Sequence, residues 1–97
     1  MMKRQGDLLI VKIDKIPEDA VKHNSRILAE GETTGHVHEL DSGEVYEKAK
    51  VLYFRVTQGK NAMLKHPEHG VVTFESGEYK VIRQREYEPR GWRYVRD

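Results

Sequence analysis

Short segments rich in β-branched and aromatic residues, each ended by turn residues, recur along this 97-residue chain. No segment keeps a helical period of apolar residues beyond one turn. This pattern predicts an all-β fold of about eight short strands, arranged as a small antiparallel β-barrel or sandwich. The expected strands are residues 7–13, 26–30, 34–40, 45 onward, 50–57, 62–66, 71–75 and 78–87.

Glycine, serine, asparagine and aspartate mark the turns expected between these strands. Residues 41–44, 58–61 and 76–77 are interpreted as turns, because these residue types meet the backbone demands of a chain reversal. Residues 16–23 have room for one helical turn, with Pro17 at its first position. The chain shows no repeat, low-complexity tract or linker, so we expect a single domain over residues 1–97.

The composition excludes several classes of protein. The chain has no cysteine, which rules out a disulfide framework and a thiolate metal site. Its longest apolar run, residues 8–11, is too short for a membrane-spanning helix or a signal-peptide core. We therefore expect a cytoplasmic protein that does not enter a membrane. A net charge of +1 gives no general attraction to nucleic acid.

Charge is distributed unevenly along the chain. Residues 30–47 contain six acidic residues and no lysine or arginine, whereas arginine and lysine predominate in residues 80–97. The two segments either pair with each other in the fold or form a dipolar surface. In the second case the negative potential around residues 30–47 favours a bound cation.

Four of the five histidines fall into two pairs. Side chains alternate along a strand, so His36 and His38 project from the same face. His66 and His69 form the second pair, and Pro67 holds His66 extended. We hypothesise that the fold brings the pairs together around a divalent transition metal such as Zn, Mn, Fe or Ni. The alternative is that all four are polar surface residues.

Two resemblances accompany the histidine motif. A glycine shortly before His-x-His resembles the first motif of the cupins, over residues 31–39, and residues 74–79 are more loosely similar to the glycine turn before the later cupin strands. The resemblance implies a small jelly-roll barrel in which His36 and His38 ligate a metal. The chain is also similar to small uncharacterised bacterial and archaeal proteins that share Thr-Gly-His-x-His and Gln-Arg-Glu-Tyr, here residues 84–87. That similarity implies no activity.

Whether the chain is an enzyme stays open at this point. A metal held by the histidines would act as a Lewis acid or activate water, with Glu68 or Glu39 as proton acceptor. Arg83 or Arg85 would steady a small anionic substrate, and Glu68 and Arg85 are our catalytic candidates. A metal-free alternative uses one histidine as acid or base, oriented by Glu68. No Gly-x-Ser-x-Gly, Walker or Gly-x-Gly-x-x-Gly motif is present.

A second functional class would use the C-terminal basic and aromatic residues. Such a face binds single-stranded nucleic acid by stacking bases on rings and pairing phosphates with arginines. The tyrosines instead belong to the core if the sheet buries them. A protein partner is a further alternative, including a homodimer formed through the flat strand at residues 50–57. The residues of this face are Tyr79, Arg83, Arg85, Tyr87, Trp92, Arg93 and Tyr94.

Overall fold

The computed structural model describes residues 1–30 and 36–83, and this part of the chain is built entirely from strands and their connections. The prediction of an all-β fold with about eight antiparallel strands is confirmed. Among the described residues there is no helix of the length and apolarity that a membrane crossing requires. The strands are β1 (Met2–Gln5), β2 (Leu8–Ile13), β3 (Val21–Lys22), β4 (Ile27–Glu30), β5 (Val37–Leu40), β6 (Glu44–Lys48), β7 (Val51–Lys65) and β8 (Val72–Arg83).

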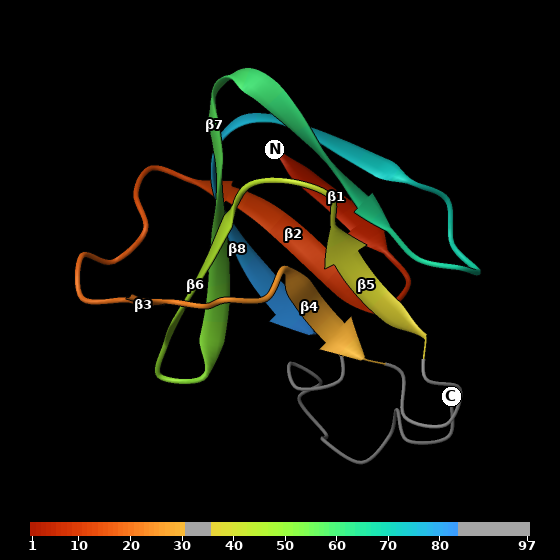
Figure 1. Ribbon diagram of the computed structural model, residues 1–97, viewed down its shortest axis with the longest axis horizontal. Coiled ribbons are helices and arrows are strands. Elements are labelled where there is room, and N and C mark those ends of the chain that lie inside the picture. The colour runs from red at the N-terminus through yellow and green to blue at the C-terminus, as the bar shows by residue number, and fades with distance from the viewer. Residues whose placement is uncertain (31–35, 84–97) are drawn as a thin grey trace.

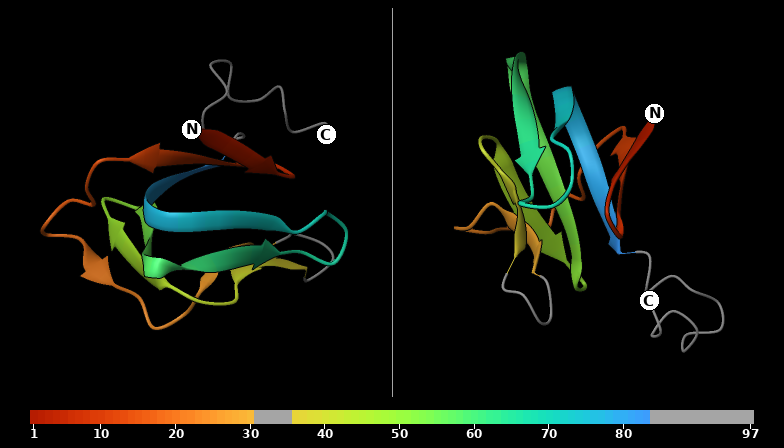
Figure 2. Two further views of the ribbon diagram at one scale, coloured as in Figure 1. Left: turned by 90° about the horizontal axis from the view of Figure 1, so that it is seen from above. Right: turned by 90° about the vertical axis from the view of Figure 1, so that its right-hand side faces the viewer.

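The eight strands form one curled sheet. Its order is β1-β2-β8-β7-β5-β4, and β6 pairs with the first part of β7 and with the short β3. Figure 1 shows β7 and β8 at the centre of this arrangement, and the two views in Figure 2 show the sheet curling into half of a barrel. The inner side of the curl is therefore the only place in this thin domain where the described residues bury a core.

Three aromatic rings lie at the centre of the core. Phe54 and Tyr79 stack with ring centroids 4.9 Å apart, and Phe74 meets both rings edge-on at 5.2–5.3 Å. All three side chains are fully buried. Aliphatic residues from six strands surround them: Leu8, Ile10, Leu28, Leu40, Val45, Val56, Leu64 and Val81.

The long ribbon made by β7 and β8 differs from the prediction. The turns expected at residues 58–61 and 76–77 are wrong, because both strands continue through them. Val56 pairs with Gly77 and Asn61 with Glu75, so residues 57–60 stand opposite Ser76 alone. This bulge bends the ribbon over, as the top of Figure 1 shows. The glycine-containing segments therefore form a bend in the ribbon instead of a chain reversal, because pairing between β7 and β8 resumes beyond the bend.

Two N-terminal segments also depart from expectation. The strand Met2–Gln5 was not predicted; it forms because it pairs in register with Leu8–Val11. The helical turn expected at residues 16–23 is wrong. A turn closed by the Ala20 N–H donating to Pro17 O at 3.1 Å leads into β3, whose two residues pair with β6. A segment this short takes its conformation from the neighbouring strand.

Candidate metal centre

The structure brings the four predicted histidines together. His36 precedes β5, His38 lies on β5, His66 follows β7, and His69 lies in the β7–β8 connection. Leu40 on β5 pairs with Leu64 on β7, and this register places the two histidine pairs side by side. Figure 1 shows β5 and the β7–β8 connection on the right. The ring centroids are 4.3 Å apart for His38–His66, 4.6 Å for His66–His69, 5.7 Å for His36–His66 and 6.0 Å for His38–His69. We call these the four rings.

His38 is the buried member of the four rings, with 5% of its surface exposed. Its Nδ1 lies 2.9 Å from Oε1 of Gln5, which is also buried. The Gln5 amide donates to Leu64 O at 2.9 Å and to Gly70 O at 2.8 Å. Both amide hydrogens are therefore used, and Oε1 is the acceptor. It follows that His38 donates from Nδ1, and that Nε2 of the neutral ring carries a lone pair.

Burial opposes protonation of two of the four rings, His38 and His66. Loss of hydration and, to a smaller extent, repulsion from the neighbouring His66 lower the pKa of His38 to about 4, against the opposing effect of Asp7. Burial also lowers the pKa of His66, with added repulsion from His69 and His36. At neutral pH both rings are therefore uncharged, which is the form that binds metal.

Asp7 adds a carboxylate beside the rings. One oxygen of Asp7 lies 3.8 Å from Nε2 of His38, and the other lies 3.8 Å from Nη2 of Arg83. Both Gln5 and Asp7 were missed at the sequence level. They flank the β1–β2 turn, and nothing in their local sequence connects them with histidines tens of residues away.

Gly6 allows this turn to approach the rings. Its φ is +60°, a conformation that side chains rarely adopt. A Cβ at this position would lie 2.8 Å from His69 Nε2 and 3.2 Å from His38 Cε1. Two ring edges therefore face one point beside Gly6, and only a residue without a side chain leaves that point open.

The imidazole and carboxylate groups are of the kinds that bind a transition metal, but as they are placed they do not form a complete coordination site. Imidazole and carboxylate together suit Zn, Mn, Fe and Ni. Among residues 1–30 and 36–83, however, no three histidine or acidic side chains converge on a common position for an ion. His66 Nδ1 accepts the Glu68 N–H at 3.0 Å, so the proton of the neutral ring is on Nε2. Coordination therefore requires side-chain rotation.

Comparison with known protein families identifies the family of this chain. A family model described as a domain of unknown function, DUF8820, matches residues 4–84. The chain belongs to the DUF8820 family. The matched range contains the four rings, Gln5, Asp7 and Arg83. Neither the comparison with curated proteins nor the one with solved structures gives a match, and the resemblance to cupins stays a prediction.

The catalytic candidates occupy different positions in this DUF8820 domain. The Glu68 carboxylate lies 3.7 Å from His36 Nδ1, and 64% of its side chain is exposed. Glu39 is also exposed, and it alternates with the buried His38 on β5. Arg85 lies outside the described residues. Of the two glutamates considered, Glu68 is therefore the one with a contact to the four rings.

The described part of the basic and aromatic face is mostly core. Tyr79 is fully buried against Phe54, and its hydroxyl donates to Glu75 O at 2.7 Å. Val81 is buried as well, and Arg83 pairs with Asp7. Tyr79 has no exposed ring face on which a base would stack. The other residues of this face, Arg85, Tyr87, Trp92, Arg93 and Tyr94, lie outside the described residues.

Proposed function

We propose that this DUF8820 protein binds a divalent transition metal at the four rings, with His38 as the central ligand. The observation that carries the proposal is the hydrogen bond between His38 Nδ1 and Gln5 Oε1. Metal-ligating histidines almost always donate their second ring nitrogen to a fixed acceptor, which orients the ring and directs the other lone pair at the metal. Gln5 provides that acceptor.

The surroundings of His38 Nε2 support a cation at this position. This nitrogen lies 3.8 Å from an oxygen of the Asp7 carboxylate. Ligand atoms ~2.1 Å from a tetrahedral metal lie roughly 3.4 Å apart, so a small movement makes the two atoms ligands of one ion. A metal cation would neutralise the Asp7 carboxylate while the imidazoles stay uncharged. A protonated His38 would do so less well, because burial opposes its protonation.

His69 is the second ligand that the geometry favours. Its Nε2 and the His38 Cε1, which is bonded to Nε2, both lie within 3.2 Å of the point where a Gly6 side chain would be. His36 and His66 complete the proposed set. His36 contacts the Glu68 carboxylate, whereas His66 would first give up the hydrogen bond from the Glu68 N–H. We therefore expect His66 to contribute least to metal affinity.

A divalent ion held by imidazoles supplies Lewis acidity to a bound oxygen. In such a site Glu68 would accept a proton at the exposed rim, and Arg85 is the second proposed catalytic residue. Both assignments depend on the metal being bound.

The test is metal binding by untagged protein freed of metal with a chelator. We would titrate the wild type with Zn²⁺ by calorimetry and with Co²⁺ by visible absorption, which reports the ligand geometry. The deciding variant is His38→Ala combined with His69→Ala. His23→Ala is the matched control, because His23 is the fifth histidine and pairs with Glu47 rather than with the four rings.

We expect one ion per wild-type chain, no measurable binding by the double variant, and unchanged binding by His23→Ala. His66→Ala should weaken binding less than His38→Ala does. Wild-type protein that takes up neither ion would overturn the proposal, and so would equal binding by the double variant. A loss in His23→Ala of the same size would place the metal elsewhere.

A further inference from the structure

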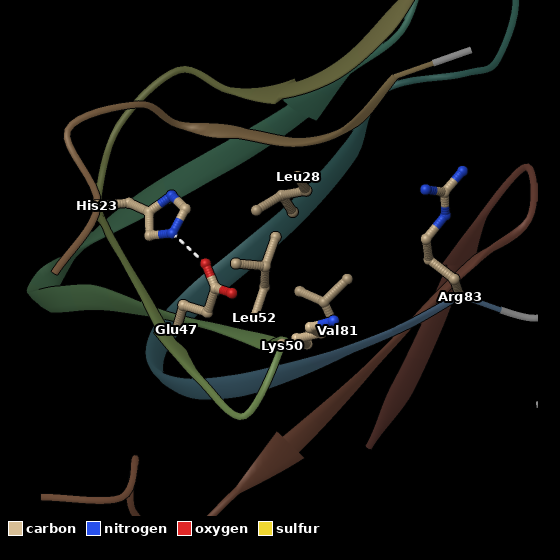
Figure 3. Close-up of a pocket in the computed structure, with 7 residues that line it drawn as sticks. All are labelled: His23, Leu28, Glu47, Lys50, Leu52, Val81 and Arg83. Carbon is tan, nitrogen blue, oxygen red and sulfur yellow. Dashed lines mark hydrogen bonds and ion pairs between the residues drawn. The ribbon is translucent and has the colours of Figure 1, made fainter. Parts of the chain in front are cut away.

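A cavity separate from the four rings lies on the inner side of the curled sheet. Its volume is about 260 Å³, the space of roughly nine water molecules. Its lining comes from β4, β6, β7 and β8, and from the residues that follow β3 and β6. Figure 3 shows three aliphatic side chains, Leu28, Leu52 and Val81, lying between the His23–Glu47 pair at one end and Arg83 at the other. The cavity is therefore apolar in the middle and polar at its ends.

The Arg83 end has an unused hydrogen-bond donor. Nε of Arg83 is buried and has no hydrogen-bond partner in the part of the chain that the structure describes. A buried donor without an acceptor is unfavourable. The contact between Arg83 Nη2 and Asp7 is 3.8 Å long, beyond hydrogen-bond range, so it does not lock the guanidinium in place. An anion in the cavity would give this side chain the bidentate partner that its geometry suits.

A strained turn places a second cation at the cavity. Lys48 pairs with Val51, so Ala49 and Lys50 form a two-residue hairpin turn. Both have positive φ, 52° and 67°, in positions that asparagine and glycine normally occupy. A strained backbone conformation of this kind is retained only where the surrounding structure holds the residue in it. Here it holds the exposed Lys50 at the cavity, where its charge adds to that of Arg83.

The His23–Glu47 pair moderates the negative charge at the other end. His23 Nε2 and Glu47 Oε1 are 2.5 Å apart, and both side chains are 37% exposed. Lys50 and Arg83 are the remaining charged side chains of the lining. Asp7, 3.8 Å from Arg83 Nη2, adds a second negative charge, so the two cations are balanced by two carboxylates. An anion is therefore favoured by the unused donor on Arg83, away from Glu47, rather than by net charge.

We infer that this cavity binds a small organic acid, with its apolar body against Leu28, Leu52 and Val81 and its carboxylate paired with Arg83. The site does not need the metal, because none of its lining residues is among the four rings. Arg83 nevertheless contacts Asp7, which lies beside His38. A bound acid would therefore sit next to the proposed metal centre and share Asp7 with it.

The test uses full-length, ¹⁵N-labelled protein in excess chelator, so that failure of the metal proposal does not affect the result. Hexanoate is the probe, because it has an apolar chain and one carboxylate. Hexanol keeps the chain and lacks the charge, whereas acetate keeps the charge and lacks the chain. We expect hexanoate to shift amide signals around residues 50–52 and 81–83, with hexanol and acetate each binding roughly tenfold more weakly or worse.

Arg83→Met should weaken hexanoate binding roughly tenfold or more, because it removes a charge-assisted hydrogen bond. Arg83→Lys should bind with intermediate affinity, because lysine cannot pair bidentately. Arg4→Met is the matched control for net charge. Arg4 pairs with Leu9 and Leu9 with Ile82, which places Arg4 on the outer face of the sheet. The Arg4→Met variant should therefore bind hexanoate with the affinity of the wild type.

Lys50→Gly separates a role of Lys50 in hexanoate binding from a role in stability, because the two should change in opposite directions. Glycine relieves the positive φ, so the unfolding temperature should rise by a few degrees. Hexanoate binding should fall at the same time, by roughly two- to fivefold, because a nearby charge is lost. Three outcomes would overturn the inference: no shifts with hexanoate at tens of millimolar, equal binding of hexanol, or equal losses in Arg4→Met and Arg83→Met.

Discussion

Gln5 accepts a hydrogen bond of 2.9 Å from Nδ1 of His38, across 33 residues of sequence. The amide of Gln5 is itself held by two backbone carbonyls, Leu64 O and Gly70 O. One buried side chain therefore ties the β1–β2 turn to β5, to the end of β7 and to the β7–β8 connection. The tautomer of His38 and the position of the chain around the four rings depend on the same residue.

Gln5→Leu should lower the free energy of unfolding by about 2–4 kcal/mol, because it leaves buried polar groups on His38 and Leu64 without partners and removes the bond to Gly70 O. If the metal is bound, its affinity should also fall about 10- to 100-fold. Urea denaturation and Zn²⁺ titration measure the two effects. Gln58→Leu is the matched control on an exposed part of β7, with an expected change of less than about 0.5 kcal/mol. Equal stability of the two variants would contradict the role of Gln5.

Stability of the metal-free protein should fall as the pH drops below about 6.5. The pKa of His38 is about 4 in the folded chain and ~6.5 in an unfolded one, so the unfolded chain binds more protons between these values. The contribution of His38 is complete above pH 6.5 and is lost as the pH falls toward 4. Between pH 7 and pH 5 we expect a loss of about 1–2 kcal/mol in urea denaturation. His38→Asn should show a flatter profile, and an identical slope would contradict the lowered pKa.

Gly6→Ala and Gly59→Ala should separate backbone strain from proximity to the rings. Both glycines have positive φ, so each variant should lose about 1 kcal/mol of stability. A Cβ at Gly6 meets His69 and His38, whereas one at Gly59 meets nothing within 4 Å. Only Gly6→Ala should therefore weaken Zn²⁺ binding, because it displaces His69. Loss of binding in both variants, or in neither, would contradict the proposed position of the ion.

Tyr79→Phe should lower the free energy of unfolding by about 1 kcal/mol. It removes the hydroxyl that donates to Glu75 O across Ser76, opposite the bulge in β7, and leaves the buried ring in place. Thermal unfolding followed by circular dichroism measures the change. Tyr53→Phe on the neighbouring strand is the control, because Tyr53 is only half-buried and pairs with Lys80, away from the bend. If both variants unfold at the wild-type temperature, the hydroxyl does not brace the bend.

Strands that are specified by the types of neighbouring residues were predictable from the sequence. The apolar β-branched run at residues 7–13 and the segment at residues 26–30 correspond to β2 and β4. A change of chain direction was also expected correctly at residues 41–43, where Gly43 has φ +98° and no room for a side chain against Arg55 O, but the expected hairpin is wrong because β5 and β6 do not pair with each other. In each case the residue types satisfy a demand made within a few residues. The turns expected at residues 58–61 and 76–77 failed because the pairing of β7 with β8 outweighs the local preference of glycine.

The sequence by itself determined an all-β chain with two histidine pairs, because alternation and β propensity are properties of neighbouring residues. Only the tertiary structure decided that the two pairs meet, that Gln5 sets the tautomer of His38, and that Asp7 lies between the rings and Arg83. These relations join residues that are about 30 to 76 positions apart in the chain. They follow from the strand order and register, which depend on how the whole sheet curls around its core.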